Sequence, residues 1–147
     1  MNAKIVGLTR YIKKGEPGEA LFSIMLLEGL GVGGDFHQGG EKQISLLPVE
    51  TRRWMEVQSE KGLCFGRFRE NILTEGLPPE TLEPGYRLSI GSAIIRIGGQ
   101  HKDCFSECGR ISKGLSCSLF ESTAFAQVEK SGIVRINDSV TILPPLS

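Results

Sequence analysis

The sequence lacks a net charge. Its 17 lysines and arginines balance its 17 aspartates and glutamates, and its isoelectric point lies near 6.7. Binding to nucleic acid or to an anionic membrane depends strongly on an excess of basic residues. The balance therefore gives no electrostatic case for either, and we expect neither nucleic acid nor membrane among the partners.

An apolar segment long enough to cross a membrane is also missing, since no run approaches the roughly 20 apolar residues that a spanning helix needs. Residues 1–7 lack the apolar core of a signal peptide. We therefore expect a cytoplasmic protein, whose thiols are kept reduced. In that compartment four cysteines indicate chemistry, metal binding or packing before they indicate disulfides.

Repeats, low-complexity segments and linkers are absent, so we expect one domain over residues 1–147. The 19 glycines are nearly twice the usual share of about 7%, which favours a turn-rich β protein. The sequence predicts a mostly-β, barrel-like domain with one main α-helix and short helical turns. The helix is predicted over residues 48–61, because it is amphipathic, opens with proline and is followed by Gly62. Strands are predicted at residues 4–13, 21–28, 43–47, 87–90, 93–97 and 122–130.

Two hairpins are predicted from turn signals between apolar segments. The first joins residues 87–90 to 93–97 through Gly91-Ser92. The second is a closing hairpin around Asn137-Asp138, with Val134, Ile136, Val140 and Ile142 on its two arms. The strand at 93–97 leads directly into the stretch that contains most of the cysteines.

Residues 29–40 contain six glycines. Such a loop can bring backbone N–H groups close to an anion, although it lacks the Gly-Lys-Ser/Thr ending of a P-loop. Asp35 and His37 alternate as they would on one side of a strand, so His37 is a candidate ligand or base. The alternative is a flexible surface loop with a structural histidine.

A polar trio, Glu70, Asn71 and Thr74, accompanies the next predicted strand. These side chains either bind a ligand or hold a turn.

The cysteine stretch, residues 97–117, holds three of the four cysteines and one of the two histidines. Basic residues outnumber acidic ones in it, and a cationic, glycine-flanked loop favours the thiolate form of a cysteine. The hypothesis is a reactive or metal-ligating thiol, most simply Cys104; the alternative is that these cysteines only fill the core. The cations are Arg96, directly before the stretch, and Lys102, Arg110 and Lys113 within it.

A zinc site is the second functional hypothesis for this stretch. His101, Cys104, Cys108 and Cys117 form a Cys3His set, which suits structural zinc. The spacing contains no Cys-x2-Cys pair. A zinc-stabilised binding module without catalysis is therefore the alternative function.

The ordered blocks of the sequence resemble the MOSC domain, named for the C-terminal domain of molybdenum cofactor sulfurases. The resemblance covers nearly the whole chain. Its main blocks are Gly34-Asp35-Phe36-His37, residues 43–47 with Glu50, residues 66–77, and Lys102-Asp103-Cys104.

This resemblance implies a β-barrel similar to the barrel domain of pyruvate kinase. It gives Cys104 the family's role of carrying sulfur or coordinating molybdenum of the pterin cofactor molybdopterin, with Cys108 as the reserve candidate for catalysis. We expect Cys104 to react faster than Cys64. The pterin phosphate would be held by backbone N–H groups of residues 29–40 and by basic side chains. The candidate cofactor-binding residues are Gly34, Asp35, His37, Arg67, Arg69, Glu70, Asn71 and Lys102.

The function implied is that of a sulfur or metal carrier related to the molybdenum cofactor; if it is an enzyme, it is a sulfurtransferase or a molybdenum-dependent oxidoreductase. The chain has no room for a pyridoxal-phosphate desulfurase domain, so sulfur would come from molybdenum cofactor biosynthesis proteins or a separate cysteine desulfurase. Two departures from the family pattern stand out. Phe105 stands where short members often have histidine, and residues 115–120 replace Gly-Asp-Cys-Val-Met-Pro.

Overall fold

The computed structural model describes residues 3–62, 65, 68–100, 108, 110 and 113–144. Seven strands form a closed barrel in the order β11-β7-β8-β9-β5-β6-β1, and β1 closes the ring by pairing with β11. All neighbours are antiparallel except β5 and β6, which run parallel. The predicted β-barrel fold is therefore confirmed. The barrel strands are β1 (Ala3–Arg10), β5 (Ile44–Pro48), β6 (Ile72–Glu75), β7 (Arg87–Ile90), β8 (Ala93–Gln100), β9 (Ala124–Lys130) and β11 (Ser139–Leu143).

The barrel interior is filled by alternate residues of its strands. On β8, Ala93, Ile95 and Ile97 are fully buried, whereas Arg96 between them is exposed. On β9 the inward residues include the small Ala124 and Ala126. Strict alternation of this kind places one face of each strand in the core and the other in solvent.

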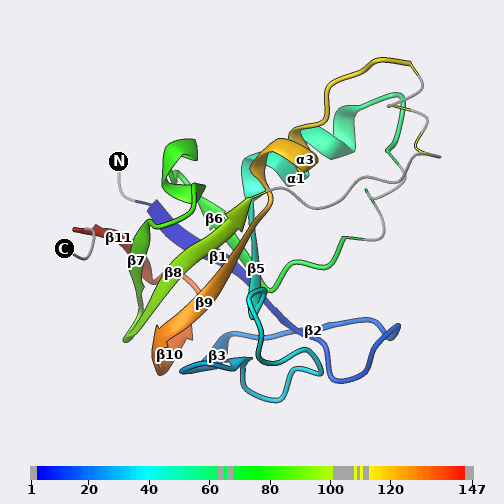
Figure 1. The fold of residues 1–147 in the computed structure, drawn as a ribbon. Coiled ribbons are helices and arrows are strands. Elements are labelled where there is room, and N and C mark those ends of the chain that lie inside the picture. Colours follow the sequence, from blue (N-terminus) through cyan, green and yellow to red (C-terminus); the bar gives the residue numbers. More distant parts are fainter. Residues whose placement is uncertain are drawn as a thin grey trace.

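The remaining elements lie at the two ends of the barrel. Helix α1 (Val49–Val57) packs on the short helix α3 (Ser118–Ser122) at one end, over a small second core of Leu47, Met55 and Leu119. A three-stranded sheet lies at the other end, as Figure 1 shows. This sheet consists of β10 (Gly132–Arg135), β3 (Ser23–Leu27) and β4 (Gly31–Val32). Two short elements remain: β2 (Glu19–Ala20), which pairs with β1, and the 3-10 helix η1 (Pro79–Leu82).

The main helix is shorter than predicted. It begins directly after Pro48, as expected, but it ends at Val57 rather than at Lys61, because Gln58 is already extended. The Lys61 side chain turns back and donates to the carbonyls of Met55 and Glu56, at 2.8 and 2.9 Å. A lysine that satisfies the last helical carbonyls replaces the hydrogen bonds that a further turn would make. None of the described helices is long and apolar enough to span a membrane.

The hairpin from β7 to β8 is confirmed, with Ile90 opposite Ala93, and β8 continues to Gln100. The prediction of a closing hairpin is wrong. Its two strands form, but β10 pairs with β3 whereas β11 pairs with β7 and β1. The turn between them is anchored on β1 instead, since Ile5 donates to the carbonyl of Asp138 and accepts from the N–H of Asn137.

Candidate functional site

A pocket of about 410 Å³ lies where the β1–β2 loop, residues 29–40 (the glycine loop) and the segment before β6 approach one another. This volume falls within the range of roughly 300–1,000 Å³ that is usual for small-molecule sites. Four of the predicted cofactor-binding residues, Asp35, His37, Arg69 and Asn71, line it together. The full lining is Tyr11, Lys13, Lys14, Gly15, Glu16, Asp35, Phe36, His37, Lys42, Gln43, Ser45, Arg69, Asn71 and Phe125.

The carboxylate of Asp35 forms the centre of the pocket floor and is only 7% exposed. Its Oδ2 accepts hydrogen bonds from the N–H of Tyr11 at 3.0 Å and from Nδ2 of Asn71 at 3.1 Å. Its Oδ1 accepts from the N–H of His37 at 3.0 Å, the local turn that an aspartate makes with the residue two positions on. The carboxylate is thus committed to holding the backbone.

Asn71 is the partner of Asp35 and is equally buried. Its Oδ1 accepts from the N–H of Ser45 at 3.1 Å, and its Nδ2 also donates to the carbonyl of Thr9 at 3.2 Å. The amide therefore ties the end of β1 and the start of β5 to the segment that enters β6. Asp35 and Asn71, with the bonds that they make, are called the Asp35–Asn71 hub below.

Glu70 does not line the pocket. Its carboxylate forms an ion pair with Arg52 on α1, and both side chains are largely buried. Its backbone carbonyl accepts a hydrogen bond from the hydroxyl of Tyr11 at 2.8 Å. Glu70 thus joins the main helix to the pocket wall.

Tyr11 forms part of the floor and is 9% exposed. Burial raises its pKa from the usual 10.0 to about 12, and the negative charge of Glu70 adds to this effect, while Arg69 and Arg52 oppose it. The ring therefore keeps its proton, and its hydrogen bond to Glu70, well into the alkaline range.

The glycine loop is not arranged as a nest of free amides. Gly34 has a φ of +82°, and a Cβ on it would lie 3.0 Å from Nη1 of Arg10, so this position serves the shape of the backbone. Many of the loop's N–H groups are used internally, and the expectation that its amides hold a phosphate stays a prediction. The amides with acceptors inside the protein are those of Gly29, Leu30, Gly33, Asp35, Phe36, His37 and Gly39.

The rim of the pocket is basic and aromatic. Lys13, Lys14, Lys42 and Arg69 make no ion pair with any residue that the structure describes. The Nζ of Lys42 lies 4.7 Å from the ring centroid of Phe125. Sequence reasoning missed the lysines and Phe125, although the adjacent pair at positions 13 and 14, just before a turn, was a usable signal.

The cysteine stretch begins beside this pocket. Gly99 on β8 pairs with the pocket residue Phe125, and Gln100 pairs with Ala124. The residues that follow, including His101, Lys102 and Cys104, lie outside the described residues, as do Cys64 and Arg67. Their predicted roles, and the expected order of reactivity of Cys104 and Cys64, stay predictions.

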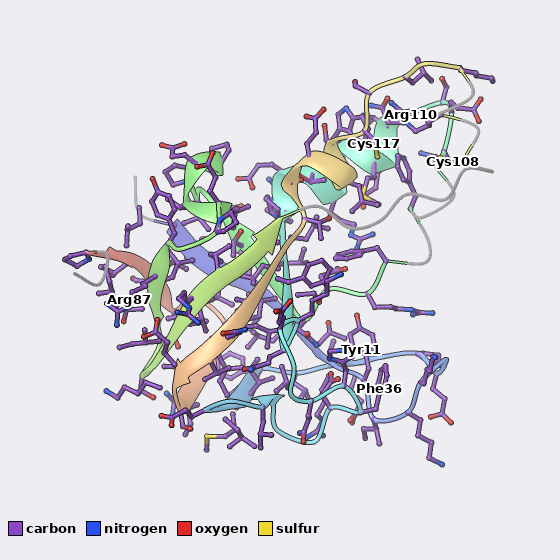
Figure 2. All side chains as sticks on the ribbon, in the orientation of Figure 1. Tyr11, Phe36, Arg87, Cys108, Arg110 and Cys117 are labelled. Carbon is purple, nitrogen blue, oxygen red and sulfur yellow. The ribbon has the colours of Figure 1, made fainter. Side chains whose placement is uncertain are left out.

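Cys108 and Cys117 lie away from the pocket. Figure 2 shows both beside Arg110 near the far end of α1, whereas Tyr11 and Phe36 mark the pocket. Cys117 packs against the small core under the helices and precedes α3. For Cys117 the packing interpretation therefore has direct support.

Arg110 anchors this part of the cysteine stretch and is 4% exposed. Its guanidinium donates to the carbonyls of Ser116 and Glu60, and its centre lies 4.9 Å from the ring of Trp54. Nearby, Lys113 pairs with Glu60. Arg110 and Lys113 are therefore engaged with structural partners. Counting the cations of the sequence overestimates the positive charge that is available to activate a thiol.

Among the residues that the structure describes, no three His, Cys, Asp or Glu side chains are grouped so that they could hold a metal ion. Two members of the Cys3His set, His101 and Cys104, fall outside that part of the chain. The zinc hypothesis therefore stays untested.

Comparison with known proteins gives a family and a fold. The family model described as "MOSC domain" matches residues 33–141. The solved structure of the YuaD protein from Bacillus subtilis is 20% identical, with a TM-score of 0.68, over 95% of this chain and 94% of that chain. YiiM from Escherichia coli is also 20% identical, with a TM-score of 0.65, over 100% of this chain and 72% of that chain. No curated protein matches the sequence.

The hub generates a stability prediction. Asn71→Ala removes the side-chain acceptor of the Ser45 N–H, the side-chain donor to the carbonyl of Thr9 and one of the two donors to Oδ2 of Asp35, which keeps the N–H of Tyr11. Leaving a buried polar group unsatisfied costs roughly 1–3 kcal/mol. We expect a loss of about 2–4 kcal/mol in the free energy of unfolding, measured by urea denaturation. His37→Ala is the control, since that side chain is exposed on the same pocket, and it should cost no more than about 0.5 kcal/mol. Equal effects of the two variants would contradict the assignment of the floor as structural.

Tyr11 generates a prediction about pH. Its pKa is higher in the folded protein than in the unfolded chain, so the stabilisation is complete below pH 10 and is lost as the pH rises to about 12. The wild type should lose about 2–3 kcal/mol of stability relative to Tyr11→Phe across that window. Urea denaturation of both proteins from pH 9 upward measures the difference. Parallel stability curves would show that the hydroxyl titrates normally.

Proposed function

Since this chain belongs to the MOSC domain family, which is linked to the C-terminal domains of molybdenum cofactor sulfurases, we propose that it holds a molybdenum–pterin group or a persulfide through the thiolate of Cys104. The remainder of a bound cofactor occupies the pocket between the β1–β2 loop and Phe125. The protein then acts as a carrier of sulfur or metal, or as the enzyme that uses them.

The pairing at the end of β8 is the observation that carries this proposal. Gly99 lies opposite Phe125, which lines the pocket, and Gln100 is the last strand residue. Cys104 follows Gln100 by four residues, and four residues span at most about 14 Å. The short distance along the chain from this strand end to Cys104 supports the proposal that the thiol serves the pocket.

The chemistry of the donors fits the cofactor. A thiolate is a soft ligand, which suits molybdenum as well as sulfane sulfur. The rim supplies cations for a phosphate, and Phe125 supplies a flat face for a pterin ring. Molybdenum, when bound, would supply the redox centre; the residues of this chain bind and orient it.

Sulfur loading needs a donor, because Cys104 cannot generate sulfane sulfur by itself. The thiolate attacks the terminal sulfur of a donor persulfide, a new S–S bond forms on Cys104, and the donor's S–S bond breaks so that its cysteine leaves as thiolate. A separate cysteine desulfurase, or a protein of molybdenum cofactor biosynthesis, is the class of partner that carries such a persulfide.

Loading of cysteine variants tests this function. Cys104→Ser should abolish persulfide formation with a persulfide donor and abolish molybdenum retention, because serine offers no soft thiolate. Intact-protein mass spectrometry detects the added sulfur atom, and elemental analysis detects the metal. Cys117→Ser is the matched control and should load normally, since Cys117 packs in the small core.

Two results would count against the proposal. Full loading of Cys104→Ser would remove the assigned thiol. Stoichiometric zinc that survives dialysis, with no molybdenum or pterin, would instead support the Cys3His binding module.

A further inference from the structure

The charges around the pocket are unbalanced. Four basic side chains reach its rim, at positions 13, 14, 42 and 69, from three separate segments of the chain. The two carboxylates of the lining do not offset them, because Asp35 is hydrogen-bonded within the hub and Glu16 carries a single negative charge. Elsewhere in the described chain, many basic side chains pair with glutamates, as Arg52 and Arg87 do. Unpaired cations that converge on a cavity favour an anion in it.

Aromatic side chains flank these cations. Phe125 is half-buried under Lys42, and Phe36 is 47% exposed at the rim, where it contacts His37 edge to face. Exposed rings of this kind offer faces on which a planar heterocycle can stack, an interaction worth roughly 1–3 kcal/mol per base in nucleic-acid sites. The pocket therefore suits a ligand that combines a flat ring with an anionic group.

The polar side chains of the pocket floor are hydrogen-bonded within the protein. The amide of Gln43 is used at both ends, since Nε2 donates to the carbonyl of Gly40 and Oε1 accepts from the N–H of Val128. Ser45 donates to the carbonyl of Arg69 and accepts from the N–H of Asn71. With the hub also satisfied, the described polar side chains of the floor are all engaged in hydrogen bonds within the protein. Recognition then falls to the charges and the rings of the rim.

Resting on the proposed function, we infer that Lys13, Lys14, Lys42 and Arg69 form a phosphate subsite, and that the pocket takes phosphomonoesters of fused, planar heterocycles with little discrimination between rings. A pterin phosphate and a purine nucleoside monophosphate share this chemistry. The phosphate determines the affinity, and the ring adds stacking energy that most planar heterocycles can supply.

Calorimetric titration with GMP, guanosine and 6-hydroxymethylpterin phosphate tests the inference at low salt. GMP and the pterin phosphate should bind with affinities within about tenfold of each other, and guanosine at least about tenfold more weakly, because a charge-assisted hydrogen bond is worth about 1.5–3 kcal/mol. Lys42→Gln should weaken GMP binding by about tenfold or more, and Lys42→Arg should retain it. All substitutions fall on exposed side chains, and circular dichroism checks that the variants stay folded.

Lys130→Gln is the matched control. Lys130 is exposed on β9, the strand that carries Phe125, has no ion pair with any described residue and does not line the pocket. Its loss should leave GMP affinity unchanged. Equal weakening by Lys130→Gln and Lys42→Gln, equal binding of guanosine and GMP, or a preference well above tenfold between the two phosphates would overturn the inference.

The same titration in Cys104→Ser separates this inference from the proposed function. GMP should still bind, since Cys104 is not one of the four basic residues assigned to the phosphate subsite. If Cys104→Ser abolishes loading but Lys42→Gln does not change the affinity for GMP, the phosphate subsite is refuted and the role of Cys104 stands. If Lys42→Gln weakens GMP binding but Cys104→Ser still loads fully, the role of Cys104 is refuted and the phosphate subsite stands.

Discussion

The hydrogen bonds of the Asp35–Asn71 hub hold the pocket together. They connect the end of β1, the start of β5, the entry to β6 and the glycine loop, which are distant in sequence and leave the barrel at one place. A buried carboxylate costs free energy unless its lone pairs are satisfied, and three N–H donors satisfy this one. The rim can therefore carry unpaired cations, because the floor beneath it is fixed by a satisfied polar network.

The acidic and amide residues of this chain thus support the floor, whereas its basic residues line the rim. Asp35, Glu70 and Asn71 set the shape of the backbone, and Glu70 extends the support to α1 through Arg52. The charges that face the cavity come from the flanking loops and from Arg69. A ligand at this site meets a rigid base and a ring of long, flexible cations.

The sequence predicted the barrel well because alternation is a local property. Ile95 and Ile97 show it plainly on β8, and the resemblance to the MOSC domain pointed in the same direction. The errors are non-local: the helix ends early because Lys61 reaches back to it, and the closing hairpin fails because β10 finds β3, more than 100 residues away. Likewise, the exposed lysines at positions 13 and 14 carry no sequence motif, and only the fold places them on the pocket that Phe125 also lines.

The central claim is that the pocket and Cys104 form one site. The most direct measurement is the rate at which iodoacetamide labels each cysteine, followed by peptide mass spectrometry with and without saturating GMP. We expect GMP to slow the labelling of Cys104 and to leave the labelling of Cys117, which packs under the helices, unchanged. Labelling of Cys104 at the same rate with the pocket filled would show that thiol and pocket are separate.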